Sequence, residues 1–156
     1  MLPQVLALDI ATTTGWALRR SNGRIESGRL VLTRGNHPGQ RHAQLRAFLT
    51  EVKNRAGGLE WVVWEDAFRQ PGKAAGLFGQ LVGVVLAWSQ HHQIGVMPVG
   101  VSAIKKFATG NGAADKAAMI AATDVPVIDD NEADARHLLR FVLASNPHLQ
   151  NGVVAA

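Results

Sequence analysis

The sequence contains no cysteine and no tyrosine among its 156 residues. Without cysteine it can form neither disulfides nor a thiolate metal site, so any metal must be held by carboxylates, histidine or water. Such ligands favour a hard divalent cation. Because nothing titrates between histidine and lysine, a net charge of only +4 gives an isoelectric point near 10.1. This charge permits attraction to nucleic acid without requiring it.

Several signatures of other protein classes are also missing. No stretch approaches the ~18 consecutive apolar residues of a membrane span, and residues 1–18 lack the basic start and processing site of a signal peptide. We therefore expect a soluble, cytoplasmic protein without a membrane partner. No glycine-rich phosphate loop, dinucleotide fingerprint or HExxH spacing occurs, which gives no support to a nucleotide cofactor or a histidine zinc site.

The length and hydrophobic content predict one globular domain over residues 1–156, with a tail that frays after about residue 147. Apolar or alternating segments at residues 5–10, 16–18 and 24–32 are separated by small polar turns at residues 12–15 and 21–23. These segments predict a three-stranded antiparallel meander.

Helical and strand patterns alternate through the rest of the chain. Residues 42–55, 73–91, 115–123 and 132–145 have helical spacing, Ser102 can cap a further short helix, and residues 61–65 and 96–99 indicate strands. Gly76, Gly79 and Gly83 keep one stripe of the 73–91 helix small, which would let another backbone approach closely. The whole pattern predicts an α/β fold in which helices flank a mixed sheet made of the meander plus parallel strands.

Three acids occupy apolar segments, where a solvated charge would be unusual. Asp9 and Glu65 each end an apolar strand, and Asp134 lies one turn inside an apolar helix. If the two strands are neighbours, the three carboxylates meet at one sheet edge and can bind Mg²⁺ or Mn²⁺. Two such ions can drive phosphodiester hydrolysis. Any single strand-end acid is more often an ordinary surface residue, so the prediction depends on the set.

A fourth ligand is expected near the start of the last helix. Asp130 and Asn131 precede Asp134 by four and three residues and therefore share its helix face. Asp130 is the stronger candidate, with Asn131 as the alternative. Asp130 could instead be the helix N-cap. Among the histidines, only His137 lies on the same face as Asp134 and merits attention as a participant.

Five segments occur in the order found in one enzyme family. They read LALDIATTTGWAL, VVWEDAF, GLFGQLVGVVLA, VSAIKKFATGNGAADKAAM and DDNEADA. The resemblance that they carry extends from about residue 5 to residue 143. In this order the chain resembles the RuvC-type Holliday-junction resolvases, and its compact length and NEADA motif look like phage or prophage members. The resemblance implies a ribonuclease-H-like fold and a bacterial or phage-infected host cell. It also implies a crossover-junction endonuclease in which Asp9, Glu65 and Asp134 are catalytic and two Mg²⁺ or Mn²⁺ ions act.

The chain departs from this family pattern at one position. The family usually has an acid or histidine three residues before its last aspartate, where this chain has the neutral Asn131. Asp130 can substitute from one residue earlier, a spacing that occurs in similar mitochondrial resolvases. We therefore include Asp130 among the predicted catalytic acids.

DNA contacts are expected from basic residues that flank these acids in the sequence, although each could simply be a solvated charge. They are Arg69, Lys73, Lys105, Lys106 and Lys116. By resemblance, Phe68 would stack on unpaired bases at a junction centre, where core packing is the alternative. The resemblance also places helix 73–91 at a homodimer interface.

Two other functions remain open from the sequence. An RNA-processing nuclease of the same fold would share the acid layout, although the KKFATGNGAADK segment favours the resolvase. A catalytically inactive module that binds branched DNA would explain Asn131 as a sign of lost chemistry. The presence of all three acids argues against that alternative.

Overall fold

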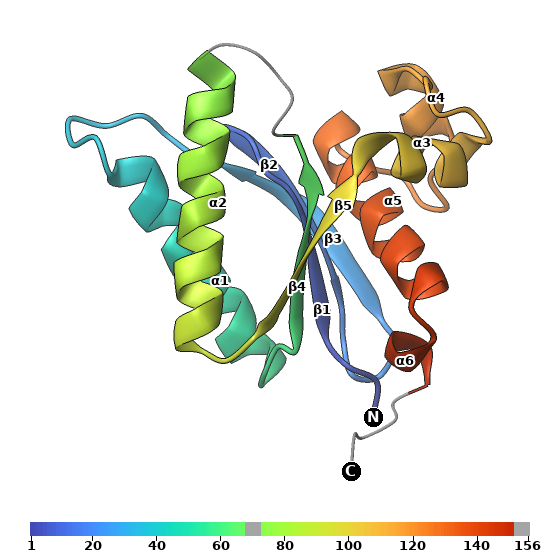
Figure 1. Cartoon of the computed structure of the whole chain (residues 1–156), viewed down its shortest axis with the longest axis horizontal. Helices are drawn as coiled ribbons and strands as arrows, with labels where there is room; N and C mark the ends of the chain where they lie inside the picture. The colour runs from blue at the N-terminus through green and yellow to red at the C-terminus, as the bar shows by residue number, and fades with distance from the viewer. Residues whose placement is uncertain (68–72, 152–156) are drawn as a thin grey trace.

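Five strands form one mixed sheet in the order β3-β2-β1-β4-β5 (Figure 1). The computed structural model describes residues 1–67 and 73–151, and the side chains of residues 73 and 74 are not described. β1 pairs antiparallel with β2, and β2 with β3, whereas β1–β4 and β4–β5 are parallel. The predicted meander with added parallel strands is therefore confirmed. The strands are β1 Val5–Asp9, β2 Thr13–Arg19, β3 Ile25–Val31, β4 Trp61–Asp66 and β5 Gly95–Gly100.

Helices cover both faces of this sheet, as Figure 1 shows. One face carries α1 Gln40–Ala56 and α2 Lys73–His91. The other carries α3 Val101–Thr109, α4 Lys116–Ala121, α5 Asp130–Ser145 and α6 Pro147–Gln150. Within residues 1–67 and 73–151, no helix combines the length and apolar character needed to cross a membrane.

The central strand β1 contributes to two separate cores because its side chains alternate between the faces. Leu6 and Leu8 join the core beneath α1 and α2. Val5 and Ala7 join the core beneath α5. The small Ala7, together with Ala17 on β2, lets α5 lie close to the sheet, and α5 carries the acidic segment toward the end of β1.

Gly15 allows the closest approach between α5 and the sheet. We expected residues 12–15 to form a turn, but Thr13–Arg19 is strand and Gly15 pairs with Asp9 in the register of β1 and β2. A Cβ atom on Gly15 would lie 1.8 Å from the carbonyl oxygen of Asn131. Glycine is therefore required here because the start of α5 contacts the strand backbone beside Asp9.

One expectation about a helix end was wrong, and the fraying expected after about residue 147 stays a prediction. α6 begins at Pro147 and buries Leu149, whose carbonyl accepts a 2.6 Å hydrogen bond from Arg19. The N-cap expected for the short helix differs. Gly100 rather than Ser102 is the N-cap of α3, so Ser102 lies inside that helix.

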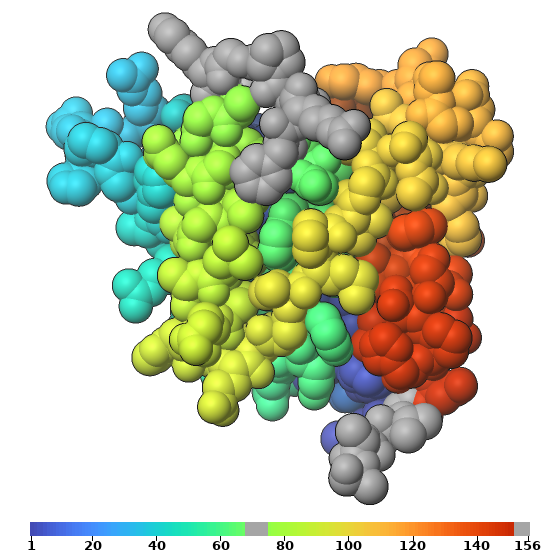
Figure 2. Space-filling model, viewed as in Figure 1, coloured from blue at the N-terminus to red at the C-terminus, as the bar shows by residue number. Residues whose placement is uncertain are grey.

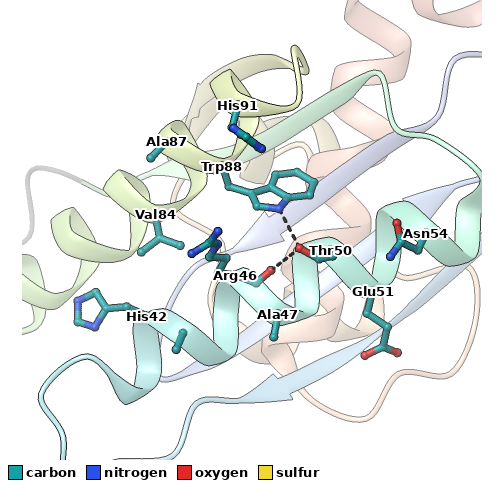
Figure 3. Close-up of a pocket in the computed structure, with 11 residues that line it drawn as sticks. His42, Arg46, Ala47, Thr50, Glu51, Asn54, Val84, Ala87, Trp88 and His91 are labelled. Atoms are coloured by element: carbon teal, nitrogen blue, oxygen red, sulfur yellow. Dashed lines mark hydrogen bonds between the residues drawn. The ribbon is translucent and has the colours of Figure 1, made fainter.

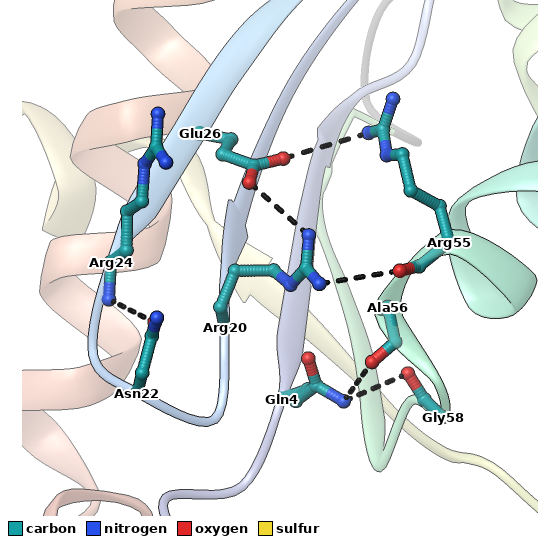
Figure 4. A network of polar contacts seen from close by, with 8 residues as sticks. All are labelled: Gln4, Arg20, Asn22, Arg24, Glu26, Arg55, Ala56 and Gly58. Carbon is teal, nitrogen blue, oxygen red and sulfur yellow. Dashed lines mark hydrogen bonds and ion pairs between the residues drawn. The ribbon is translucent and has the colours of Figure 1, made fainter.

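A polar network fastens the β2–β3 turn to the end of α1 (Figure 4). Glu26 accepts from Arg20 at 3.2 Å and pairs with Arg55 at 3.7 Å. Arg20 also donates to the carbonyl of Arg55 at 3.2 Å. The network lies at the end of the sheet opposite Asp9, so it supports the fold and does not contact the acidic cluster. Solvent-accessible ion pairs of this kind stabilise a protein by only ~0–1 kcal/mol each.

Candidate metal centre

Three carboxylates from separate elements meet at one end of the sheet. Asp9 ends β1, Glu65 lies in β4 and Asp134 lies on α5. The parallel pairing aligns Leu8 with Trp64, so the residues that follow them, Asp9 and Glu65, are side by side. One carboxylate oxygen from each of the three acids lies within 4.8 Å of the others. The structure thus brings together three of the four acids predicted to be catalytic.

The three carboxyl groups hold their protons unusually strongly. Burial first, and then the charges of Glu65 and Asp134, raise the pKa of Asp9 well above its usual value. Burial and the charges of Glu65 and Asp130 raise the pKa of Asp134 to about 7, while nearby lysines act in the opposite direction. Burial also raises the pKa of Glu65 against the effect of Lys105.

These shifts indicate what the cluster can bind. Three anionic groups held this close repel one another, and burial adds a desolvation cost for each negative charge. A bound divalent cation would remove both penalties. All three donors are carboxylate oxygens, the ligand type that Mg²⁺ and Mn²⁺ prefer. Asp9, Glu65 and Asp134 therefore fit the divalent metal that the sequence predicts.

Asp130 belongs to the surroundings of this cluster. Its charge raises the pKa of both Asp9 and Asp134, and its carboxylate pairs with Lys116, with Nζ 3.1 Å from Oδ2. The proposed alternative, that Asp130 caps the helix, is wrong. The N-cap is Asp129, whose Oδ1 accepts from the backbone N–H of Glu132 at 3.0 Å. Asp130 is thus available for a role other than capping.

The side chain of Asn131 is engaged elsewhere. It hydrogen-bonds to Asp129. Desolvation would raise the pKa of Asp129, but hydrogen bonds from the Glu132 backbone, Arg29 and Asn131 together lower it. Arg29 also forms a 3.2 Å ion pair with Asp129. These contacts support Asp130 over Asn131 as the fourth metal ligand, which stays a prediction.

The predicted DNA-contacting residues divide into three groups. Lys105 and Lys116 lie near the acids, since Lys105 lowers the pKa of Glu65 and both lower that of Asp134. Lys106 is exposed on α3. Lys73 begins α2, but its side chain is not described, and Phe68 and Arg69 lie outside the described residues. The roles of all six in DNA binding stay predictions.

His137 has a structural contact away from the acids. It is buried, and its Nε2 lies 2.7 Å from the carbonyl oxygen of Met119 in α4. The ring therefore fastens α4 to α5. Its position on the Asp134 face of the helix by sequence spacing does not make it part of the acidic cluster, which in the described chain comprises Asp9, Glu65 and Asp134.

Glu132 anchors the start of α5, a role that the sequence analysis did not assign. Its carboxylate is buried and accepts from the Ser27 hydroxyl at 2.7 Å and from the Ile128 N–H at 2.6 Å. Arg136 donates to the same Ser27 hydroxyl at 2.8 Å. The network ties α5 to β3 and so positions Asp134. The only sequence signal is that Glu132 lies on the helix face opposite Asp130 and Asp134.

Comparisons with known proteins give structural matches only. No family model matches the chain, and no curated protein does either. The structure resembles Thermus thermophilus RuvC with a TM-score of 0.69 and 21% identity, covering 91% of this chain and 95% of that one. It also resembles T. thermophilus RuvC in complex with a Holliday junction substrate, with a TM-score of 0.74, 17% identity and coverage of 94% and 97%. With TM-scores of 0.69 and 0.74 over more than 90% of both chains, this chain has the ribonuclease-H-like fold of RuvC.

Proposed function

We propose that this protein is a divalent-metal-dependent endonuclease that resolves four-way junctions and cuts other branched DNA. The observation that carries the proposal is the meeting of Asp9, Glu65 and Asp134 within 4.8 Å at one end of the sheet. Support for the substrate comes from the fold, since a solved structure of that fold is a RuvC complex with a Holliday junction. A fold alone does not determine function, so the acids and the substrate are tested separately below.

Asp9, Glu65 and Asp134 would hold the metal, with Asp130 as a fourth ligand and enough oxygens for two ions. Bound Mg²⁺ or Mn²⁺ supplies an activated water and charge stabilisation for phosphodiester hydrolysis. The chain's own contribution is a rigid frame. β1 and β4 fix two carboxylates in register, and the Glu132 network fixes the helix that carries the third.

Lysines beside the acids would position the nucleic acid. Lys105 is close enough to shift the pKa of Glu65, and Lys116 is largely exposed beside Asp130. Both can bind phosphates that flank the scissile bond, and Lys116 can help to neutralise charge that develops on the scissile phosphate. Lys106, exposed on the same helix as Lys105, extends the basic surface.

A second copy of the chain is proposed to pack on α2. No described atom lies within 4 Å of a Cβ placed at Gly76, Gly79 or Gly83, apart from their own neighbours in the helix. The expected close approach to this stripe is thus not made within the described chain. A homodimer would use it and would give the two active sites that paired cuts require.

The test is cleavage by the purified protein of three labelled substrates matched in length and end sequence. A four-way junction, a linear duplex and a structured RNA are each incubated with Mg²⁺ or Mn²⁺, and with EDTA as the metal-free control. We expect metal-dependent cleavage of the junction in preference to the duplex. Preferred cleavage of the RNA would favour the RNA-processing function, and junction binding without cleavage in either metal would indicate an inactive binding module.

A further inference from the structure

A second basic surface is separated from the acidic cluster by the first turns of α2. It surrounds an open cavity of about 650 Å³, which is lined by the loop between β3 and α1 and by the starts of α1 and α2. Its lining includes Arg34, His37, Arg41 and His42. No carboxylate lines it within the described chain. Such a surface attracts anions, and nothing in the metal chemistry explains it.

The sequence shows why this region has no negative charge. Between Glu26 and Glu51 there is no acidic residue, and this segment contains Arg34, Arg41 and Arg46. A second acid-free stretch runs from Asp66 to Asp115. The fold brings the two stretches together where α1 and α2 begin, and neither helix has an acid in its first turn. The positive ends of two helix dipoles therefore add to the arginine charges.

The loop is held in shape by side chains of α1. Gln44 accepts from the Thr33 N–H at 2.8 Å and donates to the Thr33 hydroxyl at 3.0 Å. Gln40 donates to the Thr33 carbonyl at 3.3 Å. His42 is bonded to Gln80 at 2.8 Å, which joins α1 to α2 across the cavity. The basic side chains thus project from a fastened support, which lowers the entropy cost of binding a ligand.

The two arginines at the rim, Arg34 and Arg41, pair with no acid among the described residues. Within residues 1–67 and 73–151, no carboxylate lies within 4.0 Å of the guanidinium of Arg34 or Arg41. Arg41 uses its Nε to donate to the Leu32 carbonyl at 3.2 Å. Its terminal nitrogens remain free of such partners, and Arg34 is exposed. Both guanidinium groups can therefore form bidentate bonds with a phosphate.

The basic surface has a clear limit along α1. The neighbouring groove between α1 and α2 begins at His42 and Arg46 but also contains Glu51 and the aromatic Trp88 (Figure 3). There the Trp88 indole N–H donates to the Thr50 hydroxyl at 3.0 Å. The surface with only positive charge is thus the β3–α1 loop and the first turn of α1, at the same end of the molecule as the acids.

The location relates this surface to the candidate metal centre. Leu77 of α2 lines the basic cavity and also a smaller cavity beside Ile10, the residue after Asp9. Figure 1 shows the β3–α1 loop and the α3–α4 region at one end of the molecule, on either side of the ends of β1 and β4. In Figure 2 the light-blue and orange atoms of these regions lie on opposite sides of that end.

We infer that the β3–α1 loop and the start of α1 bind the sugar-phosphate backbone of a substrate arm, through Arg34 and Arg41. This inference rests on the proposed nuclease function and adds a second anchor to it. Lys105 and Lys116 hold DNA on one side of the acids, and Arg34 and Arg41 hold an arm on the other. A substrate whose arms diverge at the cleavage site can reach both anchors.

The test compares two matched double variants in the cleavage-deficient Asp9→Asn background. Arg34→Gln/Arg41→Gln removes the basic rim. Arg24→Gln/Arg140→Gln removes the same charge at exposed positions on the β2–β3 turn and on α5. Binding to a labelled four-way junction is measured by fluorescence anisotropy over a range of salt. The slope of log K against log salt is negative, and each lost phosphate contact reduces its magnitude by about 0.9. For the rim variant, which loses two contacts, we expect the magnitude to fall by about 1.8. The control variant should retain the parent slope.

Each outcome separates this inference from the function on which it rests. In the Asp9-containing protein, the rim variant should raise KM for the junction and leave kcat and metal dependence unchanged. Equal salt slopes for the rim variant and the parent would overturn the inference while leaving the nuclease proposal intact. A change in oligomeric state by light scattering, with an unchanged slope, would also overturn it, because the rim would then be a subunit contact. If the parent neither binds nor, with Asp9 restored, cleaves the junction, the nuclease proposal itself fails.

Discussion

Lys116 Nζ lies 3.1 Å from Asp130 Oδ2 and joins α4 to the acidic start of α5. The Lys116 side chain is 83% exposed, so solvent screens the pair and it adds little to stability. Its position beside Asp9 and Asp134 gives it more weight in function. A phosphate that binds Lys116 would leave the Asp130 carboxylate free to bind metal. Under the proposed function, the pair would thus connect substrate binding to the completion of the metal site.

The roles of the three residues at the start of α5 can be separated by alanine substitution. Asp130→Ala should abolish cleavage if Asp130 is the proposed fourth ligand, and Asn131→Ala should be mild because the Asn131 side chain contacts Asp129. Asp129→Ala should lower the free energy of unfolding by ~1 kcal/mol, as expected for a lost N-cap. Junction cleavage and urea unfolding check the three variants. A more severe loss of activity from Asn131→Ala than from Asp130→Ala would assign the ligand to Asn131.

Asp9→Asn should abolish cleavage and yet stabilise the metal-free protein. The substitution removes a partly buried negative charge that is repelled by Glu65 and Asp134. We therefore expect a higher melting temperature in EDTA than for the unmodified protein, and a smaller increase when Mg²⁺ is added. Differential scanning calorimetry with and without metal measures both effects. A lower melting temperature in EDTA would show that Asp9 has a structural partner instead of repelling neighbours.

The raised pKa of Asp134 predicts how stability changes with pH. The group titrates near 3.8 when unfolded and at about 7 in the folded protein. Between these values the folded state binds more protons than the unfolded state, so the stability of the metal-free protein should decrease as pH rises from 4 to 7. Mg²⁺ should bind more tightly over the same interval, because the metal and the proton compete for the carboxylate. Asp134→Asn should flatten both profiles in thermal melts, and an unchanged profile would contradict the assignment.

The sequence was sufficient to predict the sheet and the acidic cluster for a specific physical reason. An acid at or near the end of an apolar strand lies at an end of the sheet, and Asp9 and Glu65 follow this pattern. The helical period then places Asp130 and Asp134 on one face. These local features are accessible from the sequence. The pairing of β1 with β4, which puts Asp9 beside Glu65, was a condition of the prediction that the structure supplies.

What the sequence could not predict depends on tertiary contacts. Asp129 and Asp130 are both good N-caps, and only the backbone at the start of α5 determines that Asp129 has the role. Gly15 has the sequence context of a turn, and only the structure shows that the Asn131 carbonyl packs against it. The short helix at residues 147–150 is held by the burial of Leu149 and by the hydrogen bond from Arg19 to its carbonyl, and Arg19 is far away in the sequence.

The glycine stripe of α2 yields a prediction that distinguishes an interface from an empty surface. Gly83→Gln should not strain the monomer, since no described atom lies within 4 Å of a Cβ at this position apart from its own helix. Replacing a helical glycine should even stabilise the folded chain by ~0.5–1 kcal/mol. If a second copy packs here, the larger side chain should still weaken the dimer. Light scattering over a concentration series measures the dimer's dissociation. Ala144→Gln, at an exposed position of α5, is the control.

A homodimer that remains intact in Gly83→Gln, at concentrations where the control is also dimeric, would place the subunit contact elsewhere. A monomer in the unmodified protein at assay concentrations would contradict the proposed dimer directly. It would also remove the basis for paired cuts, because a single subunit has one cluster of Asp9, Glu65 and Asp134 among its described residues.

The most direct test uses a supercoiled plasmid that extrudes a cruciform, because the four-way junction and a large excess of unbranched duplex are then in the same molecule. The protein is incubated with the plasmid and Mg²⁺, and nicked and linear products are separated on a gel. The relaxed plasmid without the cruciform and the Asp9→Asn variant are the controls. We expect linear product from paired cuts at the cruciform, and no cutting in either control. Equal cutting of the relaxed plasmid, or no cutting of the cruciform in Mg²⁺ or Mn²⁺, would contradict the proposed function.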